Sequence, residues 1–229
     1  MNKSNGNMYE WVTHTWNPLG GRCPHSCTYC STNKLMKYPA VKTKYSGAPR
    51  LYIEDLVNNQ FGNGKTIFVC AQNDLFANLI PLDWVKKILD HCKHFDNIYL
   101  FQSKNPLRMN DLQVDGWFPD KSIFCTTIET NRIYTDIMCN CPTPMDRAVG
   151  MWHLKGRKFV TIEPVMDFDL PEMVNLIELC APEQVNIGAD SGNNHLPEPS
   201  KEKLLALIDE LKKFTTIANK KNLNRILTT

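Results

Sequence analysis

Three cysteines near the N-terminus have a spacing that suits metal chemistry: Cys23, Cys27 and Cys30, in the pattern C-x3-C-x2-C. A structural zinc site closes a tetrahedron of four ligands, commonly with paired C-x2-C units, whereas the next cysteine here is Cys70. Three thiolates on one tight loop instead fit three corners of a [4Fe–4S] cluster and leave one iron open, as in a catalytic site. The spacing therefore predicts a cluster bound by these three cysteines, and the glycines directly before them would let the loop bend tightly.

Other readings of the cysteines remain open. The same loop suits a structural zinc ion with His25 or His14 as the fourth ligand. Cys139 and Cys141 form a second close pair, which suits either an auxiliary cluster or two ordinary thiols. The remaining cysteines fall in apolar strand and helix patterns, where buried inert thiols are expected: Cys70, Cys92, Cys125 and Cys180.

The elements that must position this loop alternate along the chain. Short runs rich in β-branched or aromatic residues predict strands at 67–71, 97–102, 122–128, 158–162 and 184–188, with a further strand within 10–15. Amphipathic patterns predict helices at about 81–95, 144–154, 170–180 and 200–218. Strand followed by helix, repeated, implies right-handed crossovers and a parallel sheet. Because a full eight-unit barrel needs roughly 250 residues, we expect an α/β fold with a partial (β/α)6 TIM-like barrel, with a doubly wound flat sheet as the alternative.

Polar residues follow the predicted strands directly. These tails are Gln72-Asn73-Asp74, Ser103-Lys104-Asn105, Glu129-Thr130-Asn131, Glu163-Pro164 and Ala189-Asp190-Ser191-Gly192. Ligand sites of parallel barrels and sheets lie at the carboxyl ends of the strands, so the five tails favour one shared ligand pocket. Taken singly, each residue is equally typical of a solvated turn or a helix cap.

Composition narrows the class of protein. The 229 residues are 42% hydrophobic and 22% charged, which suits one globular domain over 1–229 with ~8 N-terminal residues and the C-terminal tail at its periphery. The balance of 26 basic and 24 acidic residues excludes a strongly basic nucleic-acid clamp but leaves room for a local basic patch. No apolar run reaches the ~18 residues of a membrane span, and the first residues lack an apolar signal core. We therefore expect a cytoplasmic protein without a membrane partner, whose nine cysteines are mostly reduced thiols or metal ligands.

The cysteine spacing, with Tyr29 directly before the last cysteine, resembles the radical S-adenosylmethionine (SAM) superfamily. Over about residues 9–211 the chain resembles a phage-associated radical-SAM-like family of unknown function. The segments that carry this resemblance are Thr15-Trp16-Asn17-Pro18, Asn73-Asp74-Leu75-Phe76, Lys104-Asn105-Pro106, Ile162-Glu163-Pro164 and Gly188-Ala189-Asp190-Ser191-Gly192. The last segment departs from the G-G-E that is usual in that family. A more distant likeness is to spore photoproduct lyase, which shares the cluster spacing and the partial barrel and acts on DNA.

The resemblance implies a radical SAM enzyme, in which a [4Fe–4S] cluster reductively cleaves SAM to a 5′-deoxyadenosyl radical that abstracts a hydrogen atom from the substrate. It further implies a nucleobase, a nucleotide or a modified DNA base as substrate, and an electron donor such as flavodoxin or ferredoxin. If a phage encodes the chain, the location is the host cytoplasm. The alternative function is a non-catalytic metal-binding module that holds structural zinc or an electron-transfer cluster.

The resemblance also implies residue roles. Gln72, Asn73 and Asp74 stand where the superfamily binds the SAM ammonium group, Lys104 would face the SAM carboxylate, and Glu129 would accept from the ribose hydroxyls. The expected cofactor-binding set is completed by Tyr29, Ser103, Glu163, Gly188 and Asp190. Glu163 and Asp190 would point toward SAM or substrate, with an internal ion pair or a cap as the alternative for each.

Overall fold

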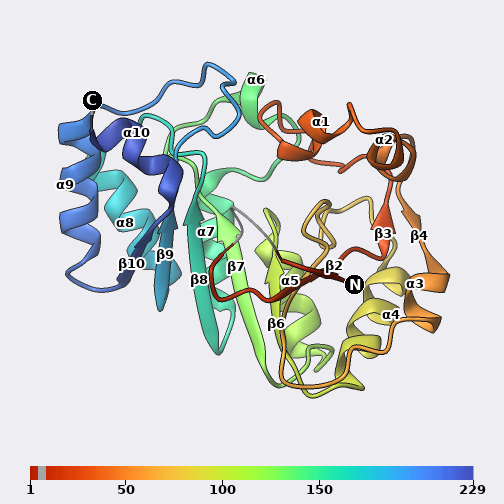
Figure 1. Ribbon diagram of the computed structural model, residues 1–229. Helices are drawn as coiled ribbons and strands as arrows, with labels where there is room; N and C mark the ends of the chain where they lie inside the picture. Colours follow the sequence, from red (N-terminus) through yellow and green to blue (C-terminus); the bar gives the residue numbers. More distant parts are fainter. Residues whose placement is uncertain (5–8, 229) are drawn as a thin grey trace.

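The structure, a computed structural model, describes residues 1–4 and 9–228 (Figure 1). Its centre is an eight-stranded sheet in the order β1-β2-β5-β6-β7-β8-β9-β10. These strands are β1 (Asn2–Lys3), β2 (His14–Trp16), β5 (Thr66–Val69), β6 (Ile98–Gln102), β7 (Ser122–Thr127), β8 (Arg157–Ile162), β9 (Gln184–Ile187) and β10 (Thr216–Asn219). Only β1 is antiparallel to its neighbour; the other neighbouring pairs of this sheet are parallel. The carboxyl ends of the parallel strands therefore meet at one edge.

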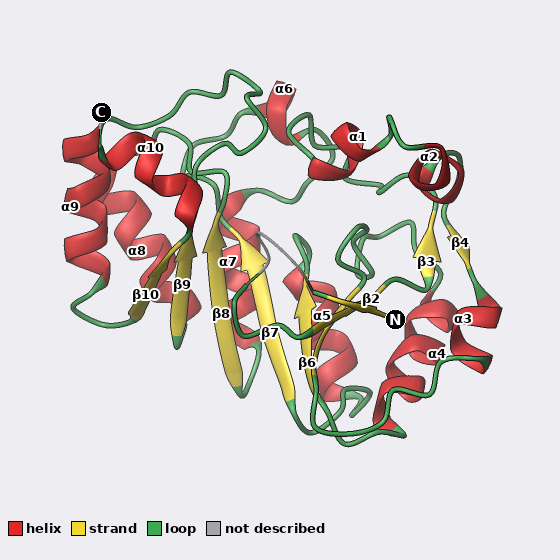
Figure 2. Ribbon diagram, viewed as in Figure 1, coloured by secondary structure: helices red, strands yellow, loops and turns green. Residues whose placement is uncertain are grey.

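The longer helices cover one face of this sheet (Figure 2). They are α4 (Leu82–Lys93), α5 (Pro106–Val114), α7 (Pro144–His153), α8 (Leu170–Cys180) and α9 (Lys201–Leu211). Alternate strand residues, such as Ile67 and Val69 of β5 and Tyr99 and Phe101 of β6, join the buried faces of these helices in the main core. Alternation with a period of two gives each strand one face for the helices and one for the inner side.

The opposite face of the sheet forms the inner surface of the barrel. Phe68, Leu100 and Ile123 lie in register on neighbouring strands and are buried together with Tyr9 and Val12. Within residues 1–4 and 9–228, none of the buried residues of this inner cluster belongs to a helix. A doubly wound sheet carries helices on both faces, so the one-sided arrangement confirms the predicted partial barrel.

Short elements complete the chain. α1 (Ser31–Leu35), α2 (Pro39–Tyr45) and α6 (Thr135–Met138) lie over the carboxyl ends of the strands (Figure 1). A two-stranded sheet of β3 (Leu19–Gly20) and β4 (Arg50–Leu51) leads into α3 (Ile53–Val57). The 3₁₀ helix η1 (Lys221–Leu223) and α10 (Asn224–Leu227) follow β10, and their Leu223 and Ile226 are buried in the main core.

Most predicted elements are confirmed, with one clear correction. The strands predicted from 67 to 188 are β5 to β9, and the strand expected within 10–15 is β2. The helix predicted over 200–218 is wrong beyond Leu211, because 216–219 form β10, in which Ile217 lies opposite Val185 of β9. The apolar helical spacing continues past Leu211 through Phe214 and Ala218, so it does not mark the end of the helix, although the β-branched run from Thr215 to Ile217 suits a strand.

Two further expectations concern the ends of the chain and membranes. Residues 5–8, part of the N-terminal segment expected at the periphery, lie outside the described residues. None of the helices in the described ranges has the length and apolar character needed to cross a bilayer.

Candidate active site

The cysteine loop, residues 21–30, runs between β3 and α1. Gly21 begins it with φ of +81°, and a Cβ atom there would lie 2.1 Å from the carbonyl oxygen of Ala48. Only glycine fits both the backbone angle and the space, so this residue produces the bend that was expected before the first cysteine. The loop contacts the residues that follow β5, because Asn73 donates to the Gly21 carbonyl oxygen and Asp74 accepts from His25.

The three cysteines line one cavity of about 290 Å³. Other walls come from the elements around the loop: Gly21, Arg22, Ser26, Thr32, Asn33, Met36, Tyr45 and Gln72. Among the described residues, no three His, Cys, Asp or Glu side chains converge on the position of a single metal ion. The thiols of Cys23, Cys27 and Cys30 thus share a cavity without closing on one point.

A fourth cysteine reaches this loop from far along the chain. The sulfur of Cys141 lies 3.2 Å from that of Cys27. Cys139 is exposed, and its thiol lies near the carbonyl oxygen of Asp136 instead. The hydrogen bond with Cys141 and the positive charge of Lys104 lower the pKa of Cys27 to about 6. The structure therefore brings only the second member of the Cys139–Cys141 pair to the predicted ligands.

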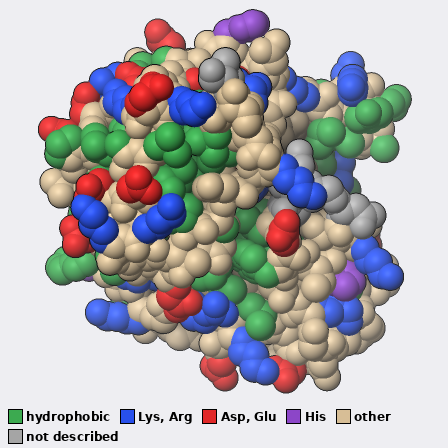
Figure 3. All heavy atoms as spheres, turned by 60° about the vertical axis from the view of Figure 1, so that its left-hand side comes forward, with side chains coloured by type: hydrophobic (Ala, Val, Ile, Leu, Met, Phe, Trp, Pro, Cys, Tyr) green, Lys and Arg blue, Asp and Glu red, His purple; other side chains and the backbone are tan. Residues whose placement is uncertain are grey.

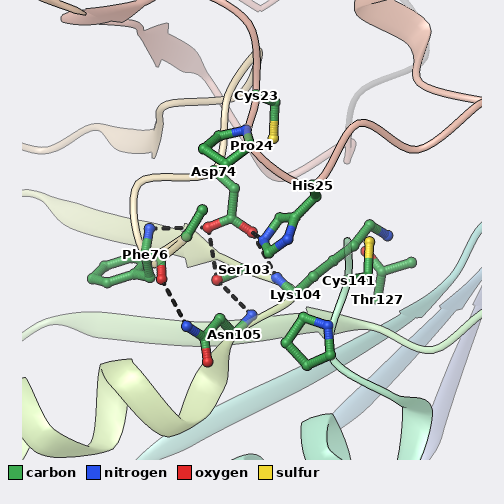
Figure 4. Close-up of polar contacts among 12 residues, drawn as sticks. Cys23, Pro24, His25, Asp74, Phe76, Ser103, Lys104, Asn105, Thr127 and Cys141 are labelled. Carbon is green, nitrogen blue, oxygen red and sulfur yellow. Dashed lines mark hydrogen bonds and ion pairs between the residues drawn. The ribbon is translucent and has the colours of Figure 1, made fainter. Parts of the chain in front are cut away.

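Asp74 ties the cysteine loop to the barrel (Figure 4). Its Oδ2 accepts from His25 Nε2 at 2.9 Å and from the backbone N–H of Lys104 at 2.8 Å. Its Oδ1 accepts from the Ser103 hydroxyl at 2.7 Å and from the backbone N–H of Phe76 at 2.9 Å. Burial opposes its ionisation, but the hydrogen bond and charge of His25 hold the pKa of Asp74 below its usual value. One carboxylate thus joins the ends of β5 and β6 to the loop.

Gln72 and Asn73 also hydrogen-bond to the segment that carries the cysteines. The Gln72 side-chain oxygen accepts from the Thr32 hydroxyl of α1 at 2.9 Å, and Gln72 also lines the cavity. The Asn73 amide donates to the carbonyl oxygen of Gly21 at 2.9 Å. Both residues of the β5 tail therefore hold the segment that carries the cysteines.

A buried ion cluster around Glu129 lies next to the loop. Lys104 Nζ is 2.5 Å from Glu129 Oε1, Arg147 Nη1 is 2.6 Å from Oε2, and the Tyr29 hydroxyl also donates to Oε1. The side chains of Glu129 and Arg147 have no exposed area. Burial alone would raise the pKa of Glu129, but Arg147 and Lys104 lower it to about 2. Two cations around one carboxylate leave an excess positive charge beside Cys27 and Cys141.

Arg147 is the member of this cluster that the sequence analysis missed. It lies on the buried face of α7, where Ala148 and Met151 are also fully buried, and its Nη2 has no hydrogen-bond partner within residues 1–4 and 9–228. A charged residue at an apolar helical position was the available signal, because such a residue requires a buried counterion.

The remaining predicted residues lie at the ends of β8 and β9. Glu163 pairs with Lys220 and accepts from the Asn222 amide at 3.3 Å. A Cβ atom at Gly188 would lie 2.7 Å from Glu163 Oε1, so glycine makes room for this carboxylate. Asp190 accepts from the backbone N–H of Gly192 at 2.9 Å and so organises its own loop. These contacts do not join the network around the cysteine loop.

Comparison with known proteins shows the family of the chain. Residues 7–202 match the family model described as "Protein of unknown function (DUF5131)". The chain belongs to this family. No curated protein matches this DUF5131 chain. The family assignment covers the cysteine loop, the barrel through β9 and the tails discussed above, and it leaves the activity open.

Solved structures similar to the DUF5131 chain include several of spore photoproduct lyase. One, of a point mutant, has a TM-score of 0.64 and 11% identity and covers 93% of this chain and 78% of the other. Another, of a double mutant with bound AdoMet and dinucleoside spore photoproduct, has a TM-score of 0.56 and 13% identity, and the chain spans 64% of its length. A third, complexed with dinucleoside spore photoproduct, has a TM-score of 0.57 at 13% identity and is likewise covered over 64% of its length. At such low identity the likeness establishes the fold, a radical SAM type of partial barrel.

Proposed function

We propose that this DUF5131 chain is a radical SAM enzyme whose cysteine loop holds a [4Fe–4S] cluster with one open iron. The observation that carries the proposal is the placement of Cys23, Cys27 and Cys30 around one cavity at the carboxyl ends of a partial barrel. That fold is shared with spore photoproduct lyase, of which one structure contains bound AdoMet. The shared fold and the C-x3-C-x2-C spacing are separate observations, and each supports a radical SAM enzyme.

The chemistry of the donor set fits such a cluster. Soft thiolate ligands are those that iron–sulfur clusters use, and the three cysteines line the same cavity. Thiolate ligands carry negative charge, and the excess positive charge of Lys104 and Arg147 lies beside Cys27 and Cys141 to balance it. When bound, the cluster would supply the electron that cleaves the SAM sulfonium and so yields a carbon radical for hydrogen abstraction from a substrate.

The protein's own residues would bind and orient SAM. Lys104 is the proposed partner of the SAM carboxylate, and Gln72, which lines the cavity, is the proposed acceptor for its ammonium group. Glu129, with Tyr29, would fix the ammonium of Lys104 from behind. Contact of Asp74 with SAM stays a prediction, since Asp74 already accepts four hydrogen bonds. The contact of Glu129 with the ribose hydroxyls stays a prediction, as do roles for Asn73, Ser103, Glu163, Gly188 and Asp190 at SAM or substrate.

A nucleobase, nucleotide or modified DNA base is the proposed substrate class. The fold likeness to spore photoproduct lyase complexed with dinucleoside spore photoproduct supports it. Flavodoxin or ferredoxin is the proposed electron donor.

Anaerobic reconstitution with iron and sulfide tests the proposal. The protein should become brown and, with dithionite and SAM, release 5′-deoxyadenosine. Cys27→Ala should remove both properties, whereas the matched control Cys139→Ala, which changes an exposed thiol, should retain them. A colourless protein that carries one zinc ion and cleaves no SAM would overturn the enzyme in favour of a metal-binding module.

A further inference from the structure

Positive charge is concentrated around the cysteine loop. Residues 11–53 contain six basic residues and no acidic one, whereas the rest of the chain has 20 basic and 24 acidic residues. This segment includes the cysteine loop, α1 and α2, which together form most of the cavity wall. By contrast, basic and acidic side chains are interspersed on the face that carries the C-terminal helices (Figure 3). The excess of basic residues therefore lies in the segment that lines the proposed site.

Two of the six basic residues have structural roles. Lys44 lies 3.2 Å from Asp55, and the Arg50 guanidinium donates to the carbonyl oxygens of Ser46 and Lys44. The other four are exposed and, among the residues described, have no ion pair with a carboxylate: Arg22, Lys34, Lys37 and Lys42. Four unpaired cations with no acidic residue in the segment make a surface suited to an anionic partner.

Three of these cations, Arg22, Lys34 and Lys37, belong to the cavity wall or directly follow residues that line it. Arg22 lines the cavity itself, and Lys34 and Lys37 directly follow the lining residues Asn33 and Met36. The Lys34 ammonium lies against Gly192, where an added Cβ would be 2.8 Å from its nitrogen. The charged surface therefore extends from the cysteine loop to the loop after β9.

An exposed aromatic ring stands among the cations. Tyr38 has 52% of its surface exposed, and the Lys37 ammonium lies 5.2 Å from the centre of its ring. Proteins that bind single-stranded nucleic acid combine backbone-tracking cations with aromatic rings on which unpaired bases stack. An exposed aromatic ring can stack on a nucleobase, whereas a partner that offers only negative charge would make no such contact with it.

We propose that Arg22, Lys34, Lys37 and Lys42 bind the phosphates of a single nucleic-acid strand, with Tyr38 stacked on an unpaired base. This inference deepens the proposed function, because it names the polymer that would deliver a nucleotide to the cysteine-lined cavity. A base must leave a duplex before chemistry on it can occur inside a protein, which favours the single strand over the duplex.

Salt dependence gives the sharpest test. The assay is fluorescence anisotropy of a fluorescein-labelled single-stranded DNA of about 12 nucleotides with the full reconstituted chain. Four phosphate contacts predict a slope of log affinity against log salt of about −3, so binding weakens roughly 50-fold between 50 and 200 mM salt. The triple variant Lys34→Gln, Lys37→Gln, Lys42→Gln should reduce the slope to about −1 and this loss to roughly threefold.

A matched control changes net charge equally elsewhere. Lys87→Gln, Lys212→Gln and Lys213→Gln alter exposed lysines of α4 and the end of α9, and this variant should bind as the unmodified protein does. Equal losses in both variants would overturn the assigned surface. Tyr38→Ser should weaken binding roughly 5- to 150-fold with the slope unchanged. No effect of Tyr38→Ser, together with equally tight binding of heparin, would overturn a nucleic acid as the partner.

The same preparations separate this inference from the enzyme proposal. SAM cleavage measured without oligonucleotide reports on the cluster alone. Intact binding without SAM cleavage would contradict the enzyme and support the surface, whereas cleavage without binding would contradict the surface only.

Discussion

Glu129 holds two cations, the buried Arg147 and the largely buried Lys104, and removing its charge tests how the site is supported. Glu129→Gln keeps the shape of the side chain but leaves Lys104 and Arg147 without a buried counterion. Breaking a buried ion pair from one side costs about 3–5 kcal/mol of unfolding free energy. The pKa of Glu129 gives a second figure: although burial opposes ionisation, Arg147 and Lys104 lower this pKa to about 2, which corresponds to roughly 3 kcal/mol in favour of the carboxylate.

Urea unfolding at neutral pH, followed by circular dichroism, measures this loss. In a chain of this size, a loss of at least ~3 kcal/mol in unfolding free energy also corresponds to a melting temperature lower by about 6 °C or more when the variant is unfolded by heat instead of urea. The matched control is Glu183→Gln, because Glu183 forms an exposed pair with Arg157 at 3.0 Å and should cost only about 0–1 kcal/mol. If the two variants unfold within about 1 kcal/mol of each other, the Glu129 cluster does not hold the site as described.

Three other predictions follow from the same contacts. Stability should fall as the pH drops from about 5 toward 2, because the folded-state pKa values of Glu129 and Asp74 are depressed and their protonation removes stability; acid titration of the urea midpoint checks this, with a smaller fall in Glu129→Gln. Gly188→Ala should lose about 1–3 kcal/mol, since its Cβ would collide with Glu163, and a stability equal to that of the unmodified protein would contradict the packing. Asp74→Asn should loosen the cysteine loop and speed amide hydrogen exchange in residues 21–30 while exchange in β8 is unchanged; equal exchange in the loop would show that Asp74 does not anchor it.

The repeating part of the fold follows from local sequence signals. Runs such as 122–128 are short, rich in β-branched or aromatic residues and closed by polar residues, so the strands and the βα alternation could be predicted without coordinates. The last strand was not, because Thr216–Asn219 is half-exposed and follows a long helical pattern without a break such as proline. Its pairing with β9 is a tertiary contact that outweighs the helical pattern.

Residue spacing in the sequence could not predict which residues far apart in the chain contact each other in the site. Cys27 and Cys141 are 114 residues apart, and nothing local to either residue specifies their contact. The strand-end rule correctly placed Lys104 and Glu129 together, because neighbouring parallel strands end at the same edge. It missed Arg147, which reaches the same carboxylate from a helix rather than from a strand tail.

The most direct test of the account is whether one iron is left open for SAM. Electron paramagnetic resonance of the anaerobically reconstituted, dithionite-reduced protein, recorded with and without SAM, measures this. A [4Fe–4S] signal that changes on addition of SAM, and that disappears in Cys23→Ala, Cys27→Ala and Cys30→Ala but persists in Cys139→Ala, is the predicted result. A signal indifferent to SAM, or one that requires a fourth protein ligand, would contradict the central claim.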